Sequence, residues 1–320
     1  MQVPELTLAG FQKADLPLSE MIGGRLDHIH DLFLGFDYEV VDSLPRSQGD
    51  VVVLLDRVNR ESRLEQLANH DGQVILVAAP TDGPFWASYF PGRRELPPNF
   101  IAAFVANNDM PDPRITNMPV GVLRRKVHQC RLAKHSGKGP RDRLLYGNFN
   151  VKADVYRFDA SGKPHIRQSL VEQFKDARWA TMDVASGARR SDEALIAYYE
   201  TMVRHKFVLS PEGLGADCYR HWESLYLGTI PIVKADPTMK SFSNLPILFT
   251  DDYSEISERY LNEQWEQYRL RRFEFKGLMK SFYREQFLQR ISRLSNPRFL
   301  CWGFRGTPEE EFLDLLTMGG

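Results

Sequence analysis

Short apolar runs recur along the first part of the chain, each bounded by polar residues. Runs of this kind, rich in Val, Ile and Leu, are typical of strands that are buried on both faces of a sheet. The predicted strands are Tyr38–Val41, Val51–Leu55, Val74–Ala78 and Ile101–Val105. Between the second and third runs, Arg60–Asn69 has Leu64 and Leu67 at helical spacing. The order strand, helix, strand predicts a parallel α/β sheet.

The second half alternates more regularly between strand and helix patterns. Its helix Ser191–His205 has apolar residues at i, i+3, i+4, i+7 and i+8, so its tyrosines are predicted to pack in the core. The repeated strand and helix order predicts a second Rossmann-like domain. The predicted elements are strand Leu144–Phe149, helix Pro164–Phe174, strand Trp179–Val184, helix Ser191–His205, strand Phe207–Ser210, helix Asp217–Leu227, strand Ile230–Val233 and strand Ile247–Phe249.

The length and local composition indicate how these elements divide into domains. At 320 residues with 42% hydrophobic content, the chain exceeds the usual size of one domain. A basic stretch with the flexible run His135-Ser-Gly-Lys-Gly-Pro140 is interpreted as a solvated connector. The predicted divisions are an N-terminal Rossmann-like domain at 1–125, a linker at 126–142, a C-terminal Rossmann-like domain at 143–295 and a tail at 296–320 that packs back across the domains.

Charge and cysteine content exclude several classes of protein. The 41 Lys and Arg nearly balance the 42 Asp and Glu, so no overall field favours nucleic acid as a partner. Cys130, Cys218 and Cys301 lie far apart, which fits a reducing compartment and provides no spacing for zinc. No apolar stretch approaches the length of a membrane span and none resembles a signal peptide. We therefore expect a cytoplasmic protein without an integral membrane segment.

The segment from Lys206 to Val233 carries the candidate chemistry. A buried strand is predicted to end at Ser210, a loop with Gly213 and Gly215 follows, and a helix is predicted to begin near Asp217. Ligands of open α/β sheets bind at the carboxyl ends of the strands, and a helix N-terminus behind a glycine loop offers N–H groups and a positive dipole end to phosphate. The segment therefore predicts a diphosphate site.

Two charged residues of this helix complete the predicted site. Arg220 can bind phosphate oxygens, and Glu223 at i+3 on the same face can accept hydrogen bonds from ribose hydroxyls. A purely structural interpretation is equally compatible with the spacing: Asp217 caps the helix, Glu223 pairs with Arg220, and the glycines form a turn.

Better-known nucleotide and metal motifs do not fit this chain. Cys218 replaces the third glycine of a dinucleotide fingerprint, and Leu132 stands where a P-loop ending at Lys138 needs glycine. The chain has no Asp-x-Asp pair, and no His and Cys cluster suggests zinc. The sequence thus predicts no cofactor and no metal.

This segment resembles the donor-binding signature of exostosin-like (GT47-type) glycosyltransferases and related bacterial and viral enzymes. The resemblance is carried by Ser210-Pro-x-Gly, Asp217-Cys-x-Arg-x-Trp-Glu223 and Gly228-x-Ile-Pro-Ile-Val233. The run Leu-Leu-Tyr-Gly-Asn148-Phe-Asn150 resembles the start of that family's C-terminal half, and Arg167 is matched to a basic residue that follows it. The resemblance covers roughly 144–249. The animal exostosins carry a membrane anchor, and no matching apolar segment is found in this sequence. We therefore expect a bacterial or viral origin.

The resemblance implies an α/β protein of the GT-B fold, with two Rossmann-like domains facing a central cleft. It makes 1–125 the acceptor domain and 143–295 the nucleotide-sugar donor domain. It implies an inverting, metal-independent transfer of a hexosyl or pentosyl group from a nucleotide-sugar, UDP-sugar favoured, to a saccharide or glycoconjugate acceptor. The alternative is a catalytically inactive nucleotide-sugar- or glycan-binding domain of a larger assembly. The predicted donor-binding residues are Asn148, Arg167, Ser210, Gly213, Gly215, Asp217, Arg220 and Glu223.

The acceptor side is predicted from loop positions in the first half. Direct displacement needs a general base near the acceptor. Asp109 is the first choice because it lies in a polar loop after a predicted strand, with Asp56 and Asp82 as alternatives in comparable loops. Phe85 and Trp86 can stack on an acceptor sugar, but a hydrophobic plug between the domains is the favoured interpretation of these residues.

Overall fold

The structure is a computed structural model in which the chain divides into two compact units. Unit 1 comprises Met1–Ser19 and Gly121–Gly277, and unit 2 comprises Glu20–Val120 and Leu278–Gly320. Each unit is built around a parallel sheet of its own. The described residues are 5–13, 32–33, 35–45, 49–55, 60–78, 83–137, 139–151, 166–183, 191–213 and 215–303.

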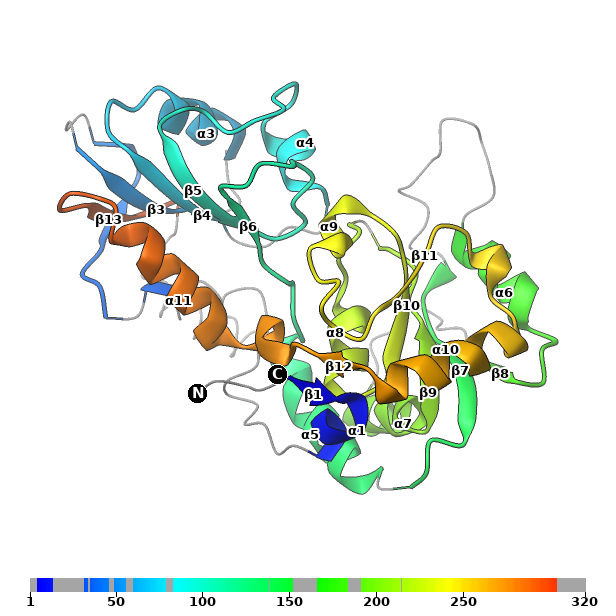
Figure 1. Cartoon of the computed structure of the whole chain (residues 1–320). Coiled ribbons are helices and arrows are strands. Elements are labelled where there is room, and N and C mark those ends of the chain that lie inside the picture. Colours follow the sequence, from blue (N-terminus) through cyan, green and yellow to red (C-terminus); the bar gives the residue numbers. More distant parts are fainter. Residues whose placement is uncertain are drawn as a thin grey trace. The chain divides into compact units, whose positions relative to one another are not determined.

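Unit 2 is built on a six-stranded sheet (Figure 1). Its strands are β2 (Glu39–Val41), β3 (Val51–Leu55), β4 (Val74–Ala78), β5 (Phe100–Val105), β6 (Ile115–Asn117) and β13 (Arg298–Trp302). All neighbours are parallel, in the order β2-β13-β3-β4-β5-β6. Every residue of β3 and β4 is buried, because alternate side chains enter hydrophobic clusters on opposite faces of the sheet. This two-sided burial explains the uninterrupted apolar runs in the sequence.

Helices cover both faces of this sheet. They are α3 (Arg60–Ala68), α4 (Phe85–Tyr89) and α11 (Lys280–Ile291). On one face, Leu64 and Leu67 of α3 enter the cluster that contains Val51. On the other face, Phe287 of α11 packs edge-on against Phe104, with ring centroids 5.5 Å apart. Unit 2 is therefore a three-layered, Rossmann-like α/β unit, as predicted for the first half.

Unit 1 contains a five-stranded parallel sheet. Its strands are β7 (Arg143–Gly147), β8 (Ala180–Met182), β9 (His205–Leu209), β10 (Ile230–Lys234) and β11 (Leu248–Thr250). They lie in the order β11-β10-β9-β7-β8. The chain adds β8 on one side of β7 and then returns to add β9 on the other side. The carboxyl ends of β7 and β9 thus form the topological switch point, where ligands of open α/β sheets bind.

Helices on both faces of this sheet, together with a small antiparallel pair of strands, complete unit 1. Ser191 caps α7 by accepting a hydrogen bond from the backbone N–H of Ala194 at 3.3 Å. The predicted inner face of this helix is confirmed, since Leu195, Tyr198, Tyr199, Met202 and Val203 are all buried. The elements are β1 (Leu6–Thr7), β12 (Arg272–Phe273), α1 (Leu8–Lys13), α5 (Arg124–Ser136), α6 (Ile166–Phe174), α7 (Asp192–Val203), α8 (Tyr219–Tyr226), α9 (Pro237–Lys240), α10 (Glu258–Leu270) and the 3-10 helix η3 (Tyr253–Glu255), with a second 3-10 helix, η4 (Phe275–Leu278), at its end.

The predicted domain boundaries differ from these units. The expected linker at 126–142 is largely α5, which packs against α7. Its buried residues include Gln129, Cys130 and Ala133, none of which is a large apolar residue, so the surrounding basic side chains hide the helical pattern. The expected tail at 296–320 contains β13, which lies between β2 and β3 of unit 2. Helix α11, expected in the donor domain, also belongs to unit 2.

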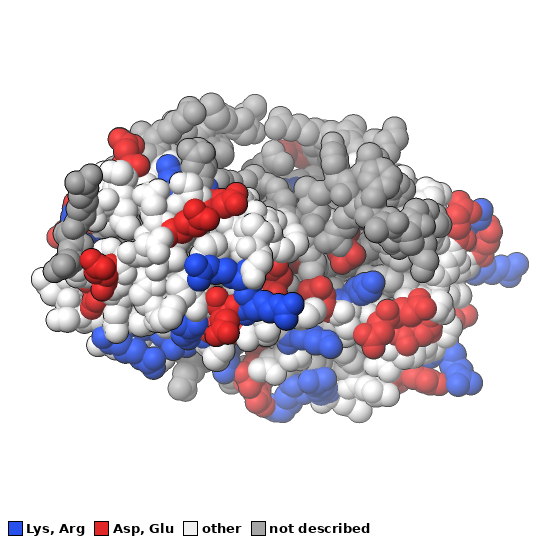
Figure 2. Space-filling view, turned by 90° about the horizontal axis from the view of Figure 1, so that it is seen from above, with Lys and Arg blue, Asp and Glu red and all other residues white. Residues whose placement is uncertain are grey.

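The charged side chains do not gather on the face that Figure 2 shows. Lys and Arg are interspersed there with Asp and Glu, in keeping with the near balance of 41 basic and 42 acidic residues. An anionic ligand must therefore find its positive charge in a local site.

Among the described residues, no helix has the length and apolar character needed to cross a membrane.

Candidate functional site

A pocket of about 240 Å³ lies in unit 1 at the switch point of the sheet. Residues that follow β7 form one side of it, and the first residues of α8 form another. The positive end of the α8 dipole therefore acts on this pocket. Its lining residues are Lys126, Asn148, Phe149, Asn150, Arg167, Tyr198, Cys218, Tyr219, Arg220 and Glu223.

The two predicted arginines both line the pocket. Arg220 donates from Nε to the carbonyl oxygen of Asn148 at 3.0 Å and from Nη1 to that of Pro211 at 3.2 Å. Its Cζ lies 5.5 Å from the centre of the Phe149 ring. No hydrogen bond from Nη2 of Arg220 is found within the described part of the chain. The guanidinium is therefore oriented by backbone carbonyls and retains a donor for a ligand.

Arg167 fixes the frame of the pocket. Its side chain is 5% exposed and donates from Nε and Nη2 to the carbonyl oxygen of Glu212 at 3.2 and 2.8 Å. From Nη1 it donates to the carbonyl oxygen of Asn150 at 2.8 Å. These bonds tie α6 to the segments that follow β7 and β9. They use neutral acceptors, so the positive charge of Arg167 is not cancelled by them.

Glu223 is placed at the pocket as predicted, but its partner is not Arg220. The carboxylate is 3% exposed, and its Oε1 lies 2.9 Å from Nζ of Lys126 on α5. Burial alone would raise the pKa of Glu223, but the charge and hydrogen bond of Lys126, with smaller contributions from Tyr199 and Arg220, lower it. Glu223 is therefore a buried carboxylate held in its charged form.

Asn148, the predicted residue after β7, belongs to a polar network with a carboxylate that the sequence interpretation did not identify. Its Nδ2 donates to the Tyr146 hydroxyl at 3.0 Å and to Oδ2 of Asp183 at 2.9 Å. Asp183 directly follows β8, so the network links Tyr146, Asn148 and Asp183 at the carboxyl edge of the sheet. The Asn148 amide is thereby oriented at the rim of the pocket.

The remaining predicted donor residues do not line the pocket. Ser210 is fully buried, and its Oγ lies 2.7 Å from Nδ1 of His221. Asp217 accepts a hydrogen bond from the Trp222 indole at 2.5 Å, and the N-cap position of α8 is Cys218.

A backbone hydrogen bond joins two residues within the glycine loop that lies between Ser210 and Asp217. The N–H of Gly213, expected to be available to phosphate, donates to the carbonyl oxygen of Gly215 at 3.1 Å. These residues shape the loop before α8.

Cys218 immediately precedes α8 and lies beside His221. Its Sγ is 3.5 Å from Nε2 of His221, whose ring nitrogens also face the carbonyl of Ala216 and the Ser210 hydroxyl. Burial alone would raise the pKa of Cys218, but His221, followed by Arg220 and Arg167, lowers it from 9.0 to about 6. The pocket wall thus carries a thiol that ionises near neutral pH.

In unit 2, the structure gives the predicted catalytic and acceptor residues packing and capping roles. Asp109 accepts hydrogen bonds from the backbone N–H groups of Trp86 at 2.7 Å and Ala87 at 2.9 Å, in the first turn of α4. Phe85 and Trp86 are 0% and 1% exposed, which contradicts the expected stacking face for an acceptor sugar. Asp56 and Asp82 lie outside the described residues. The catalytic base remains a prediction.

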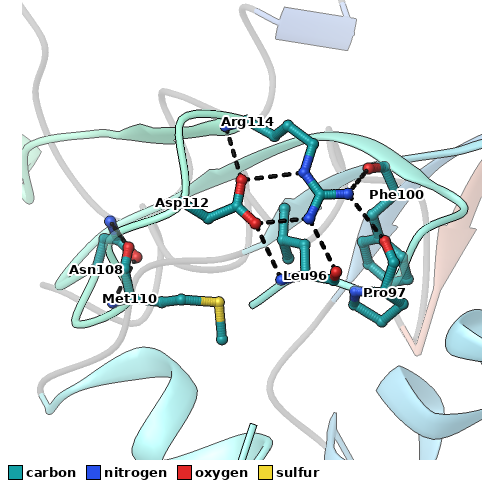
Figure 3. A network of polar contacts seen from close by, with 7 residues as sticks. All are labelled: Leu96, Pro97, Phe100, Asn108, Met110, Asp112 and Arg114. Atoms are coloured by element: carbon teal, nitrogen blue, oxygen red, sulfur yellow. Dashed lines mark hydrogen bonds and ion pairs between the residues drawn. The ribbon is translucent and has the colours of Figure 1, made fainter. Parts of the chain in front are cut away.

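The loop that carries Asp109 is held by the network in Figure 3. Arg114 donates from Nη2 and Nε to the Asp112 carboxylate at 2.6 and 3.0 Å, and also to the carbonyl oxygens of Leu96, Pro97 and Phe100. The hydrogen bonds of Arg114 and of backbone N–H groups lower the pKa of Asp112 to about 2, against the opposing effect of burial. This ion pair closes the loop between β5 and β6 onto the segment before β5.

Comparison with known proteins finds a remote structural similarity and no match in sequence. No family model and no curated protein matches the sequence. Among solved structures, it is similar to the crystal structure of an alpha1,3-fucosyltransferase, with 10% sequence identity and a TM-score of 0.41. The match covers 85% of this chain and 95% of that one. The residues of the pocket are therefore the basis for its function.

Proposed function

We propose that the chain is an inverting, metal-independent glycosyltransferase. It transfers a hexosyl or pentosyl group from a nucleoside-diphosphate sugar, UDP-sugar favoured, to a saccharide or glycoconjugate acceptor. The two Rossmann-like units fit the GT-B class of these enzymes. The exostosin-like signature in the sequence remains an expectation about the closer family.

One observation carries the proposal: the charge of the pocket at the switch point of unit 1. Lys126, Arg167 and Arg220 line it together with a single carboxylate, Glu223. The Cys218 thiol is paired with His221, whose pKa it raises against the effect of burial, and this pair carries no net charge, so the cations exceed the anions by two. A nucleoside-diphosphate sugar carries one negative charge on each of its phosphoryl groups and matches this excess. A nucleoside-monophosphate sugar leaves one cation unmatched. The pocket therefore favours a diphosphate donor.

The same cations supply the electrophilic assistance that the reaction needs. Negative charge develops on the nucleoside diphosphate as the glycosidic bond breaks, and preorganised donors that face this charge lower the barrier. Arg220 and Arg167 are already oriented by backbone carbonyls, so little reorganisation is required. This arrangement can neutralise a diphosphate with side chains alone, which supports a metal-independent route.

Binding of nucleotides to the full chain tests the proposal. We would measure the melting temperature with UDP, GDP, UMP and CMP, with and without EDTA. A ligand at about 100 times its Kd stabilises the folded state by about 2.7 kcal/mol. We expect a diphosphate to raise the melting temperature, unchanged by EDTA, and the monophosphates to have less effect. If neither UDP nor GDP shifts the melting temperature, the proposed donor site is wrong.

A matched pair of variants locates the binding. Arg220→Gln removes a cation of the pocket, whereas Arg269→Gln removes a surface arginine on α10 that pairs with Glu266. Because a hydrogen bond to a charged group contributes about 1.5–3 kcal/mol, we expect Arg220→Gln to weaken diphosphate binding by about 10-fold or more. We expect Arg269→Gln to bind as the unmodified protein does. Equal affinity of both variants would remove the pocket from the donor site.

The second candidate function is a nucleotide-sugar-binding domain without catalysis. The position of Asp109 favours it, because both carboxylate oxygens of the predicted base accept hydrogen bonds from α4. Release of the nucleoside diphosphate from its sugar distinguishes the two. Tight donor binding with no release, alone or with a panel of saccharide acceptors, would support the non-catalytic domain.

A further inference from the structure

Lys126 is a pocket residue that lies outside the donor signature. It belongs to α5 and is 97 residues away from Glu223 in the sequence. Its Nζ lies 2.9 Å from Oε1 of Glu223, and the two side chains are 26% and 3% exposed. A carboxylate with so little access to water depends on protein groups for its charged state.

The neighbours of Glu223 come from α5, α7 and α8. From α7, the Tyr198 hydroxyl lies 3.5 Å from Oε2, and Tyr199 lies close enough to influence the carboxylate. Burial raises the pKa of Tyr199 and, on α5, that of Cys130, so neither carries charge near neutral pH. Balancing charge for Glu223 therefore comes from cations.

Of the cations beside Glu223, Lys126 makes the direct contact. Arg220 precedes Glu223 by one turn of α8, but its hydrogen bonds to described residues go to the carbonyl oxygens of Asn148 and Pro211. In the described part of the chain, Lys126 is the one cation found within hydrogen-bonding distance of the carboxylate. Loss of this amine would leave burial as the dominant influence on the pKa of Glu223. Burial raises that pKa and favours the neutral acid.

We propose that Lys126 is a positioning residue for the ribose of the nucleotide. It anchors one oxygen of Glu223 and keeps the group a carboxylate, so that a lone pair remains to accept a hydrogen bond from a ribose hydroxyl. A carboxylate has about four lone-pair sites, whereas a protonated carboxyl group loses part of this capacity. The inference rests on the proposed function and adds to it a residue that sets selectivity for ribose.

The test compares nucleoside diphosphates that differ in one hydroxyl group. Calorimetry of the full chain with UDP or GDP, and with the 2′-deoxy and 3′-deoxy forms of the same nucleotide, gives a ribose preference as a ratio of Kd values. Measurements from pH 5.5 to 8.5 give its pH profile. The variants are Lys126→Met, Lys126→Arg and, as a matched control, Lys175→Met, which breaks the exposed pair with Glu172.

For the unmodified chain we expect a ribose preference of about 10-fold or more that is constant across this range, as for a hydrogen bond to a charged acceptor. In Lys126→Met the preference should fall at neutral pH and recover as the pH rises and Glu223 ionises. Lys126→Arg should restore the constant profile, and Lys175→Met should leave it unchanged. A structural role alone would lower the melting temperature without creating a pH-dependent preference.

The possible failures are distinguishable. If the unmodified chain binds a diphosphate with a ribose preference and Lys126→Met keeps that preference at every pH, the role of Lys126 is wrong and the donor site stands. If the unmodified chain binds without any preference for ribose, the ribose role of Glu223 and Lys126 is wrong. If it binds no nucleoside diphosphate, the proposed function fails and this inference fails with it.

Discussion

The thiol of Cys218 offers a sharp test of the electrostatics of the pocket. It is half-buried at the start of α8, and its Sγ lies 3.5 Å from Nε2 of His221. Burial opposes ionisation, but His221, Arg220 and Arg167 outweigh it and bring the pKa from 9.0 to about 6. His221 fits this role, because both of its ring nitrogens face oxygen atoms and an imidazolium can donate to each of them.

The size of the effect follows from this pKa. At pH 7 a thiol with a pKa of about 6 is about 90% thiolate, whereas one with a pKa of about 9 is about 1% thiolate. The thiolate is the nucleophile, but its intrinsic reactivity falls with its pKa, so the rate at pH 7 rises by less than the thiolate ratio. The midpoint of the pH–rate profile is therefore the decisive quantity.

Alkylation with iodoacetamide, followed by peptide mass spectrometry from pH 4.5 to 9, measures that midpoint. We expect a midpoint near pH 6 for Cys218 and slow labelling of Cys130 and Cys301, which are fully buried. His221→Asn should move the midpoint upward, because it removes the largest contribution that lowers the pKa. A midpoint of 8 or higher in the unmodified protein would show that His221 and the arginines do not act on this thiol.

The same labelling reports on occupancy of the pocket. Cys218 lines the cavity together with Arg167 and Arg220, so a nucleoside diphosphate that binds there should slow its alkylation. Cys218→Ser should abolish the rapid labelling and confirm the assignment of the reactive thiol. Unchanged labelling under saturating nucleotide would place the nucleotide elsewhere.

Three further predictions concern stability and the role of Asp109. The folded-state pKa of Asp112 is depressed from 3.8 to about 2, so its contribution to stability is present above pH 4 and is lost as the pH falls toward 2. Asp112→Asn should lower the free energy of unfolding, measured by urea titration, by about 2 kcal/mol at pH 7 and by less in acid. His205 is fully buried, and burial lowers its pKa from 6.5 to about 4. Stability that is present above pH 6.5 should therefore be lost as the pH falls to 4, by up to about 3 kcal/mol. His205→Gln should flatten this dependence of the free energy of unfolding on pH, and an unchanged dependence would assign it to other groups. Asp109→Asn should lower stability by about 1 kcal/mol because Asp109 accepts N–H bonds from the first turn of α4; in a transfer assay, turnover retained by this variant would leave capping as its role, whereas lost turnover with donor affinity intact would support the predicted base.

The fold could be predicted where burial imposes a local pattern. Strands β3 and β4 are buried on both faces, so their apolar runs coincide with the predicted ranges Val51–Leu55 and Val74–Ala78. The sequence does not predict helix α5, because its buried residues, such as Gln129 and Ala133, produce little hydrophobic contrast. The pairing of β13 with β3 joins residues more than 240 positions apart, and no local pattern specifies such a partner.

The candidate site was predictable to the extent that it is contained in one strand, loop and helix. Arg220 and Glu223 are brought to the pocket by the helical spacing recognised in the sequence. Ser210 and Asp217 match the same signature, but their side chains serve the loop itself through His221 and Trp222. A motif indicates which segment shapes a site and does not distinguish residues that face the ligand from those that hold the loop.

The most consequential pocket residue outside the motif, Lys126, shows why the remainder needs the structure. Its basic segment was interpreted as a solvated connector, because charge runs are usually exposed. Burial of Glu223 changes that assessment: a carboxylate that is 3% exposed requires a counter-charge, and the helix packed against α7 supplies it at 2.9 Å. A predicted buried acid in a binding segment thus implies a cation elsewhere in the chain, and basic segments predicted to pack near it are where that cation should be sought.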